Sequence, residues 1–242
     1  PTQDDLPYDD GIPMESPRHQ FQMALLIETL DRWLEARGDG FTGGNLFLYY
    51  SLAQVSDNPF VGPDFFVALD VPRGERKSWV VWEQGKGPDL VIELLATSTA
   101  RYDKTAKKTL YARQVHVPEY YWYDPFDPTD FAGFILHGGD YRPLAADAQD
   151  RIHSPILNLS LGRWTGTYQG VTTTWLRWFA PDGALLPTAA EAAQQQAEAA
   201  QQQAEAAQQQ AEAAQQQAEA AQQRAERLAE RLRRLGVDPD EP

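Results

Sequence analysis

The stretch Pro88-Asp-Leu-Val-Ile-Glu-Leu-Leu95 decides the fold class of this chain. Its five apolar residues surround one glutamate, Glu93, in a run that opens with a Pro-Asp pair and is typical of an apolar strand. Side chains alternate along a strand, so Asp89 and Glu93 lie on the same face of the sheet. Because a carboxylate is expensive to bury in such a strand, we expect a compensating cation beside Glu93.

Short aromatic or β-branched runs, bounded by Gly and Pro, occur before and after this strand. Such runs predict further strands. We expect the following segments to join residues 90–95 in one sheet: 45–50, 64–69, 79–82 and 120–123. Later runs predict strands that extend or cap this sheet, at residues 131–136, 157–161, 166–168 and 175–179.

Two segments have the apolar spacing of amphipathic helices. Residues 16–37 form the first, with Ser16 as its cap, Pro17 in its first turn and Gly38 as its stop. Residues 103–114 form the second, which crosses over the sheet between two of the strands. The order of helix, strands, helix and more strands predicts an α/β fold, with a mixed β-sheet flanked by helices and extra β-strands.

The composition changes abruptly after Pro187. From Glu191 the sequence repeats Glu-Ala-Ala-Gln-Gln-Gln-Ala with a period of seven residues. If Ala197 is heptad position a, apolar residues occupy the a and d positions as far as Leu235, which is typical of a coiled coil. Alanine buries little surface and the flanking positions are mostly Gln, so a solitary Ala-rich helix is the alternative.

These changes predict three parts of the chain. Residues 1–187 form the folded domain, residues 188–236 form the Ala/Gln-rich coiled-coil helix, and residues 237–242 form a disordered tail. Gly236 ends the helix. We expect self-association through this helix, as a homodimer or a larger assembly.

The composition excludes several classes of function. The chain of 242 residues has no cysteine, which excludes thiol catalysis, disulfide bonds and Cys-ligated zinc. Its four histidines show no metal-ligand spacing, and no serine lies in a nucleophile-elbow pattern. No apolar run approaches the roughly 20 residues that span a bilayer, and residues 1–10 lack the apolar core of a signal peptide. These features predict a soluble cytoplasmic protein with no membrane partner.

The net charge of −14 is unfavourable for binding nucleic acid, but the charge is unevenly distributed. Residues from Glu191 onward hold ten acidic and five basic side chains, which leaves 25 acidic and 16 basic ones, or −9, for the rest. Residues 73–113 hold nine basic and five acidic side chains, or +4. This window is either a phosphate-binding surface or a solvated helix face with a lysine-rich loop.

A second Pro-Asp pair, Pro63-Asp64, opens another apolar strand. Asp64 and Glu93 on neighbouring strands could together hold Mg²⁺, which takes one or two carboxylates and keeps several waters for a substrate phosphate. Taken singly, Asp64 could be a turn residue that bonds local backbone, and Glu93 could belong to a buried structural ion pair. Two such carboxylates followed by a lysine-rich helix favour a site that cleaves phosphodiester bonds.

One set of residues carries a resemblance to a known family. They are Pro88 to Glu93, Ser98-Thr99, Asp103, Lys107, Tyr111 and Val117-Pro-Glu-Tyr-Tyr-Trp-Tyr-Asp-Pro125. Together they resemble the Uma-two family of restriction endonucleases, which belongs to the PD-(D/E)XK nuclease superfamily. The resemblance covers roughly residues 6–183, and residues 93–125 are its most specific part. One departure is Ala96-Thr97, where the family usually has Ser-Pro; it alters the loop after Glu93 and spares every expected ligand.

The resemblance implies a restriction-endonuclease-like fold and a DNA endonuclease that depends on Mg²⁺ or Mn²⁺. In this family the catalytic lysine, usually two residues after the second carboxylate, is displaced to the following helix, and here that strand position is Leu95. The catalytic residues implied are Asp64, Glu93 and Lys107, of which Asp64 and Glu93 are the metal ligands. The supporting residues implied are Asp89 and Tyr111, and weak nucleic-acid contacts are expected from Arg101, Lys104 and Lys108.

A second hypothesis keeps this fold without catalysis. An acidic interaction protein could oligomerise through its C-terminal helix and bind a partner in the cleft of the former active site. The net charge favours this second hypothesis, whereas the intact set of two carboxylates and one lysine favours the endonuclease.

Overall fold

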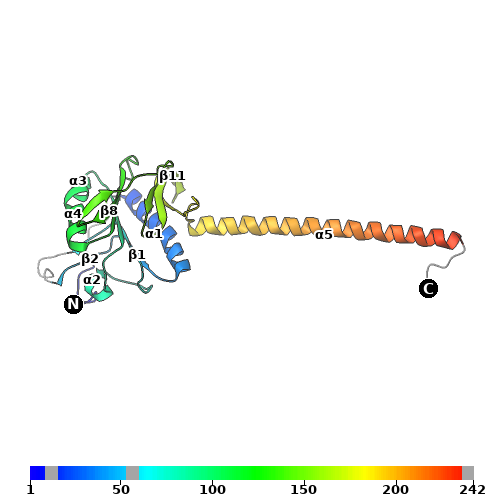
Figure 1. Cartoon of the computed structure of the whole chain (residues 1–242), viewed down its shortest axis with the longest axis horizontal. Coiled ribbons are helices and arrows are strands. Elements are labelled where there is room, and N and C mark those ends of the chain that lie inside the picture. The colour runs from blue at the N-terminus through cyan, green and yellow to red at the C-terminus, as the bar shows by residue number, and fades with distance from the viewer. Residues whose placement is uncertain (9–15, 53–59, 236–242) are drawn as a thin grey trace. The chain divides into compact units, whose positions relative to one another are not determined.

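A mixed sheet of six strands is at the centre of the computed structural model, in the order β1-β4-β6-β7-β8-β9 (Figure 1). One of its two central strands is β6 (Leu90–Leu94), which is antiparallel to β4 (Phe65–Ala68) and parallel to β7 (Glu119–Tyr123). The other strands are β1 (Phe41–Gly43), β8 (Phe131–His137) and β9 (Asp140–Pro143). The structure describes residues 1–8, 16–52 and 60–235. The predicted α/β fold with a mixed sheet is confirmed.

Two sheets of three strands accompany the central one. The first has the order β3-β2-β5, and the second has the order β10-β11-β12. Their bounds are β2 (Leu48–Tyr49), β3 (Phe60–Val61), β5 (Trp79–Val80), β10 (Ile152–Ser154), β11 (Leu159–Tyr168) and β12 (Val171–Phe179). The prediction that residues 45–50 and 79–82 join the central sheet is wrong, because β2 and β5 pair with each other.

Some predicted boundaries also differ from the structure. Val81 and Trp82, expected in a strand, begin the one-turn helix α2 (Val81–Gln84). The runs 157–161 and 166–168 belong mainly to one strand, because β12 pairs with β11 along a continuous antiparallel ladder. Four strands that were not predicted (β1, β3, β9 and β10) have two to four residues each, too few for an alternating pattern to stand out.

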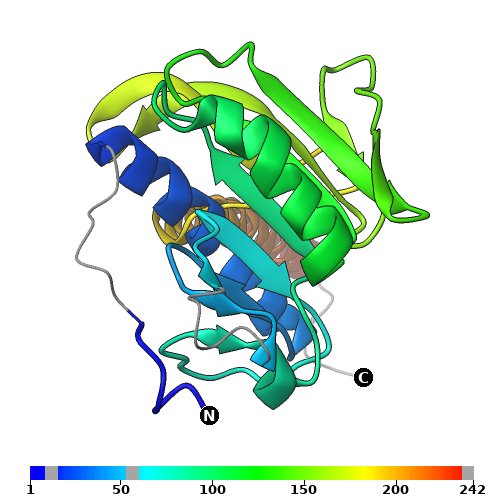
Figure 2. The ribbon, with the colours of Figure 1, turned by 90° about the vertical axis from the view of Figure 1, so that its left-hand side faces the viewer.

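Two apolar clusters cover the two faces of the central sheet. On one face, α1 (Pro17–Arg37) contributes Leu26 and Leu30, which pack with Ile92 and with residues of the β10-β11-β12 sheet. On the other face, Tyr111 of the helical segment 100–115 packs with Val91 and with the β3-β2-β5 sheet. Figure 2 shows these two helical segments on opposite sides of the central strands. The strand β6 is therefore buried on both faces.

The ends of α1 are those predicted. Ser16 is the N-cap, and its Oγ accepts a hydrogen bond of 3.4 Å from the backbone N–H of His19. Gly38 adopts a left-handed φ of 88°, and its N–H donates to the carbonyl of Leu34 at 2.8 Å. A side-chain cap of this kind typically stabilises a helix by about 1 kcal/mol. These ends fix the length of the helix that covers one face of β6.

The chain divides into two units, Pro1–Thr188 and Ala189–Pro242. The second contains α5 (Ala189–Arg234), a single helix of 46 residues (Figure 1). The predicted helix stop at Gly236 and the predicted disordered tail at 237–242 lie outside the described residues. Within the described part of the chain, no helix is both long enough and apolar enough to cross a membrane.

Candidate active site

Asp64 and Glu93 lie opposite each other on neighbouring strands. The strands β4 and β6 pair with Phe65 opposite Ile92, and one further step along this register brings Asp64 opposite Glu93. Oδ2 of Asp64 accepts a hydrogen bond of 2.7 Å from the backbone N–H of Leu94. The backbone of β6 therefore holds the Asp64 carboxylate beside the strand position of Glu93.

The fully buried Glu93 carboxylate uses both of its oxygens. Oε2 accepts a hydrogen bond of 2.7 Å from Nζ of Lys107, and Oε1 accepts one of 2.9 Å from the hydroxyl of Tyr111. Within the chain, the cation that compensates the Glu93 carboxylate is Lys107, whose side chain is only 13% exposed. Both partners come from the helical segment that crosses over the sheet.

Lys107 is held by several acceptors. Besides Glu93, its Nζ donates to the carbonyl of Gly62 at 3.1 Å and lies 3.6 Å from Oδ1 of Asp103. Burial lowers the pKa of Lys107, but attraction to the carboxylates of Glu93, Asp64 and Asp103 outweighs it and raises the pKa above its ordinary value. Lys107 is therefore a fixed positive charge at the centre of three acidic side chains.

The pKa of the Glu93 carboxylate is also shifted by burial and by neighbouring charges. Burial raises its pKa well above the ordinary value, and the negative charges of Asp64 and Asp103 raise the pKa further, although Lys107 opposes them. Burial also raises the pKa of Tyr111 well above its ordinary value, so its hydroxyl remains a hydrogen-bond donor to Glu93. Additional positive charge near Glu93 would favour the ionised form of its carboxylate.

Asp103, Lys107 and Tyr111 all belong to residues 100–115, which we call the site helix. It consists of α3 (Ala100–Tyr102), η2 (Asp103–Lys107), α4 (Lys108–Leu110) and η3 (Tyr111–Val115), and the two η segments are π-helical. In an α-helix, residues four apart drift by about 40° around the axis, because one turn takes 3.6 residues. The wider π turns reduce this drift, so residues at a spacing of four stay on the side that faces Glu93.

Asp103 is a buried member of this cluster for which the sequence predicted no role. Its backbone carbonyl accepts a hydrogen bond of 2.8 Å from the hydroxyl of Tyr120, and its carboxylate faces Lys107. The signal in the sequence is the regular spacing of Asp103, Lys107 and Tyr111, four residues apart. Helices are recognised in a sequence by apolar residues at helical spacing, so a spacing shared by Asp103 and Lys107, which are charged, is easily passed over.

Asp89, predicted to support the site, has different partners. Its Oδ2 accepts hydrogen bonds from Nζ of Lys86 at 2.6 Å and from the backbone N–H of Leu69 at 2.7 Å. Asp89 lies on the same face as Glu93, as predicted, but four residues along a strand correspond to about 13 Å. The structure therefore brings Asp64, Glu93, Lys107 and Tyr111 together and leaves Asp89 at the other end of the strand.

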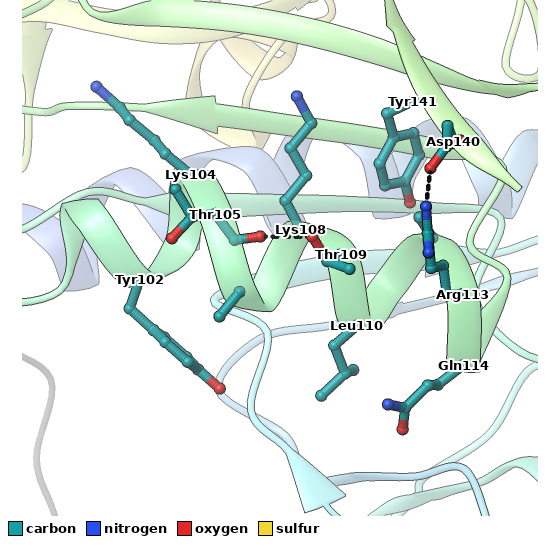
Figure 3. A pocket seen from close by; sticks show the side chains of 12 residues that line it. Tyr102, Lys104, Thr105, Lys108, Thr109, Leu110, Arg113, Gln114, Asp140 and Tyr141 are labelled. Carbon is teal, nitrogen blue, oxygen red and sulfur yellow. Dashed lines mark hydrogen bonds and ion pairs between the residues drawn. The ribbon is translucent and has the colours of Figure 1, made fainter.

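The three expected nucleic-acid contacts lie on or near the outer side of the site helix. Lys104 pairs with Asp130, and Lys108 lies over the rings of Trp122 and Phe134. Figure 3 shows Lys104 and Lys108 along the outer face of the site helix, where they help to line a pocket of 810 Å³. Arg101 is exposed at the first turn of the same helix. None of these three side chains contacts Glu93 in the described interactions.

The donor set suits a hard divalent cation with an open coordination sphere. No group of three or more Asp, Glu or His side chains within residues 1–8, 16–52 and 60–235 is arranged to hold a metal ion. Asp64 and Glu93 supply two carboxylates, and Mg²⁺ commonly takes one or two from a protein and keeps water and substrate phosphate as its other ligands. The residues therefore fit Mg²⁺ or Mn²⁺ better than a cation that needs a closed protein cage.

Comparison with known families identifies a nuclease family. The Uma2 family model, described as "Putative restriction endonuclease", matches residues 2–165. The chain belongs to this family. Uma2 is the Uma-two family that the Glu93 to Pro125 stretch resembles, so the resemblance is confirmed. Membership of Uma2 supports a nuclease activity. The matched region contains Asp64, Glu93 and Lys107.

Other comparisons concern the fold and the tail. A crystal structure of a "putative nuclease belonging to DUF820" from Anabaena variabilis ATCC 29413 is similar, with 16% sequence identity and a TM-score of 0.43. The similarity covers 64% of this chain and 90% of that one. Residues 185–235 match the family described as "Alanine-zipper, major outer membrane lipoprotein", which supports the coiled-coil character of the C-terminal helix. No curated protein matches the chain.

Proposed function

We propose that this Uma2 protein is a DNA endonuclease that depends on Mg²⁺ or Mn²⁺, with Asp64, Glu93 and Lys107 as its catalytic residues. The observation that carries the proposal is the juxtaposition of two carboxylates on paired strands with a buried lysine, whose Nζ lies 2.7 Å from Glu93. In a nuclease family, a buried carboxylate cluster with a fixed cation is suited to cleaving a phosphodiester bond. Membership of Uma2 also supports a nuclease activity.

Each residue would have a distinct task. Asp64 and Glu93 would hold the divalent ion, which when bound supplies a more acidic water and neutralises charge on the scissile phosphate. Lys107 would position the attacking water or stabilise negative charge in the transition state. Tyr111 would orient the Glu93 carboxylate, and Asp103 would orient the Lys107 ammonium, through the contacts described above.

DNA is the proposed substrate, and its phosphates would be contacted weakly by Arg101, Lys104 and Lys108. Lys104 already pairs with Asp130 and Lys108 already lies over two aromatic rings, so neither is fully available to phosphate. Few phosphates would then be neutralised, and we expect the DNA affinity to depend only weakly on salt concentration.

A second candidate is a catalytically silent interaction protein with the nuclease fold. The charge of −9 outside the C-terminal repeat favours it, because phosphate binding relies on Lys and Arg. The two candidates differ in whether metal binding depends on the two carboxylates. For either candidate, we propose self-association through α5, with a homodimer or a larger assembly as the product.

The deciding experiment is a calorimetric titration of Mn²⁺ into the full chain at fixed salt, with a DNA cleavage assay on the same samples. We expect Asp64→Asn to lose metal binding and cleavage, whereas Lys107→Met keeps metal binding and loses cleavage. Asp89→Asn is the matched control, because it removes a carboxylate charge from the same face of β6 far from the cluster. A folded parent that binds no metal would favour the silent candidate, and equal losses in Asp64→Asn and Asp89→Asn would refute the site assignment.

A further inference from the structure

Two exposed aromatic side chains lie near the end of the central sheet that carries Glu93. Phe126, in the loop after β7, is 58% exposed, and Tyr102, in the first turn of the site helix, is 52% exposed. Single exposed apolar residues are common on protein surfaces and need no explanation. These two are different because the topology and their neighbours tie both of them to the candidate active site.

The topology brings both rings to one edge of the central sheet. The strands β6 and β7 are parallel, with Leu94 opposite Tyr123, so both strands end at this edge. The site helix follows the end of β6, and the loop that contains Phe126 follows the end of β7. Asp64, the partly exposed carboxylate of the cluster, lies at the same edge, because β4 is antiparallel to β6 and begins there. A substrate bound across this edge would therefore reach both rings and the cluster.

The two rings approach this edge from opposite faces of the sheet. Tyr102 belongs to the site helix, which covers one face, and Figure 3 shows its side chain extending from the first turn of that helix. Phe126 lies beside the start of α1, which covers the other face, with its ring centroid 5.7 Å from that of His19. Nε2 of His19 donates to the carbonyl of Leu95 at 3.0 Å, two residues after Glu93. The ring of Phe126 is therefore linked through one side chain to the end of β6.

The exposed position of Phe126 is fixed by its own loop. Oδ1 of Asp124 accepts hydrogen bonds from the backbone N–H of Phe126 at 2.7 Å and from that of Asp127 at 3.1 Å. The guanidinium of Arg18 lies 4.4 Å from the centroid of the Phe126 ring. A ring that is held in place before binding loses little conformational freedom when a ligand stacks on it. Phe126 is therefore a preorganised stacking surface.

Each ring also has an arginine beside it. Arg18 lies over Phe126, and the exposed Arg101 directly precedes Tyr102 in the chain. Within residues 1–8, 16–52 and 60–235, no carboxylate forms an ion pair with either arginine. A guanidinium binds a phosphate through two parallel N–H donors. A flat apolar surface and a phosphate donor therefore occur together at both places, which is the combination that a nucleotide requires.

The charge of the domain favours a single strand over a duplex. Duplex DNA carries one negative charge per about 1.7 Å of its axis, twice the charge density of one strand. The chain before Glu191 has a charge of −9, and Lys104 at this edge is already paired with Asp130. Stacking of a base on an aromatic ring adds affinity that does not depend on phosphate charge. Bases in a duplex are paired and stacked on each other, so only unpaired bases can use these rings.

We propose that Phe126 and Tyr102 stack on unpaired nucleotides that flank the scissile phosphate, and that Arg18 and Arg101 bind neighbouring phosphates. The substrate is then single-stranded DNA, or a single-stranded segment within a duplex. This inference rests on the proposed endonuclease function and narrows its substrate class. Every base has a flat face, so stacking of this kind discriminates little between sequences.

The test is fluorescence anisotropy with one labelled oligonucleotide of mixed sequence, alone and as the duplex with its complement. The full chain is titrated into each form in EDTA at fixed salt, which prevents metal-dependent cleavage. We expect the single strand to bind at least about tenfold more tightly than the duplex. Phe126→Ala and Tyr102→Ala should each weaken binding of the single strand by about tenfold, as expected for the loss of stacking on one base, and leave duplex binding unchanged.

Variants that retain the ring are the matched controls. Phe126→Tyr and Tyr102→Phe keep the aromatic face and should bind the single strand like the parent. Both residues are exposed, so all four variants should fold, and circular dichroism checks this. If the ring-retaining variants lose as much affinity as the alanine variants, stacking is not the cause and the proposal fails.

Cleavage of the same two DNA forms with Mn²⁺ separates this inference from the function on which it rests. Faster cleavage of the single strand, reduced in both alanine variants, would support both. Equal cleavage of the two forms, unaffected by either alanine variant, would overturn the substrate class and leave the endonuclease intact. Ring-dependent binding of the single strand without cleavage would support the stacking surface and overturn the endonuclease. A parent that binds neither form would overturn the stacking surface.

Discussion

Glu93 and Glu119 are two fully buried carboxylates on the two central strands of the sheet, yet their surroundings differ. Glu119 accepts hydrogen bonds from neutral donors: the hydroxyl of Tyr121 at 2.9 Å and the backbone N–H of Ile156 at 3.0 Å. Glu93 instead pairs with the ammonium of Lys107 and lies near two further carboxylates. Burial raises the pKa of both glutamates.

This difference teaches that burial of a carboxylate does not by itself identify an active site. The hydrogen bond from the N–H of Ile156 joins Glu119 of β7 to the loop after β10, so it links the central sheet to the β10-β11-β12 sheet. The partners of Glu93 instead concentrate charge of both signs in one place, which a purely structural hydrogen-bond network does not need. We therefore propose a structural role for Glu119 and a catalytic one for Glu93.

The same substitution at both glutamates tests this comparison most strongly. We expect Glu93→Gln to lower metal-dependent DNA cleavage by more than about 100-fold. Loss of a residue that only hydrogen-bonds to a metal ligand typically costs about 10- to 100-fold, and loss of a metal ligand itself should cost more. Glu119→Gln should leave the cleavage rate unchanged at temperatures where it is folded. The measurement is a cleavage time course, with circular dichroism to establish folding. If both variants lose activity equally while folded, the comparison fails.

The comparison of the two glutamates also shows which features of the site can be predicted from the sequence. The apolar run in Pro88 to Leu95 predicts β6 and places Glu93 in it, and the Pro63-Asp64 pair predicts the neighbouring strand. The sequence does not reveal that Asp89 is neutralised locally, although Lys86 stands three residues before it. It also does not reveal the π turns of the site helix, because helix recognition from sequence assumes 3.6 residues per turn.

Contacts between residues far apart in the sequence explain the other differences between the predicted and the observed structure. The family resemblance selects Lys107 from the five basic residues of the site helix, since helical periodicity alone does not identify which lysine faces a strand. Residues 45–50 look like any other strand of the central sheet, and only their pairing with β5 places them elsewhere. The partners of Glu119 include a backbone N–H 37 residues away, which no local pattern predicts.

Two tyrosines allow a matched test of smaller effect. Tyr111 donates its hydroxyl to Glu93, and Tyr121 donates its hydroxyl to Glu119, each at 2.9 Å. Each Tyr→Phe change removes one buried hydrogen bond, and we expect each to lower the free energy of unfolding by about 1–2 kcal/mol in urea denaturation. Only Tyr111→Phe should also reduce cleavage, by about 10- to 100-fold. Equal activity of the two variants would mean that Tyr111 has no part in orienting Glu93.

The pH dependence of stability provides the finest test of the structural role of Glu119. Burial raises its pKa in the folded chain, although hydrogen bonds from Ser154, Ile156 and Tyr121 oppose the rise. The folded state therefore binds the proton more tightly than the unfolded state, whose pKa is about 4.3. The free energy of unfolding must fall as the pH rises from about 4.3 through the raised folded pKa.

Glu119→Gln does not titrate and should not show this fall. We expect the unfolding free energy of the variant, minus that of the parent, to increase with pH across this window, by at most about 1.4 kcal/mol per pH unit, and to become constant above it. Glu93 is present in both proteins, so its own raised pKa cancels in the difference. Urea denaturation from pH 4 to 8 gives the measurement. A difference that is flat or decreases with pH would show that the neutral donors hold Glu119 ionised, and its contrast with Glu93 would then lie in the metal site alone.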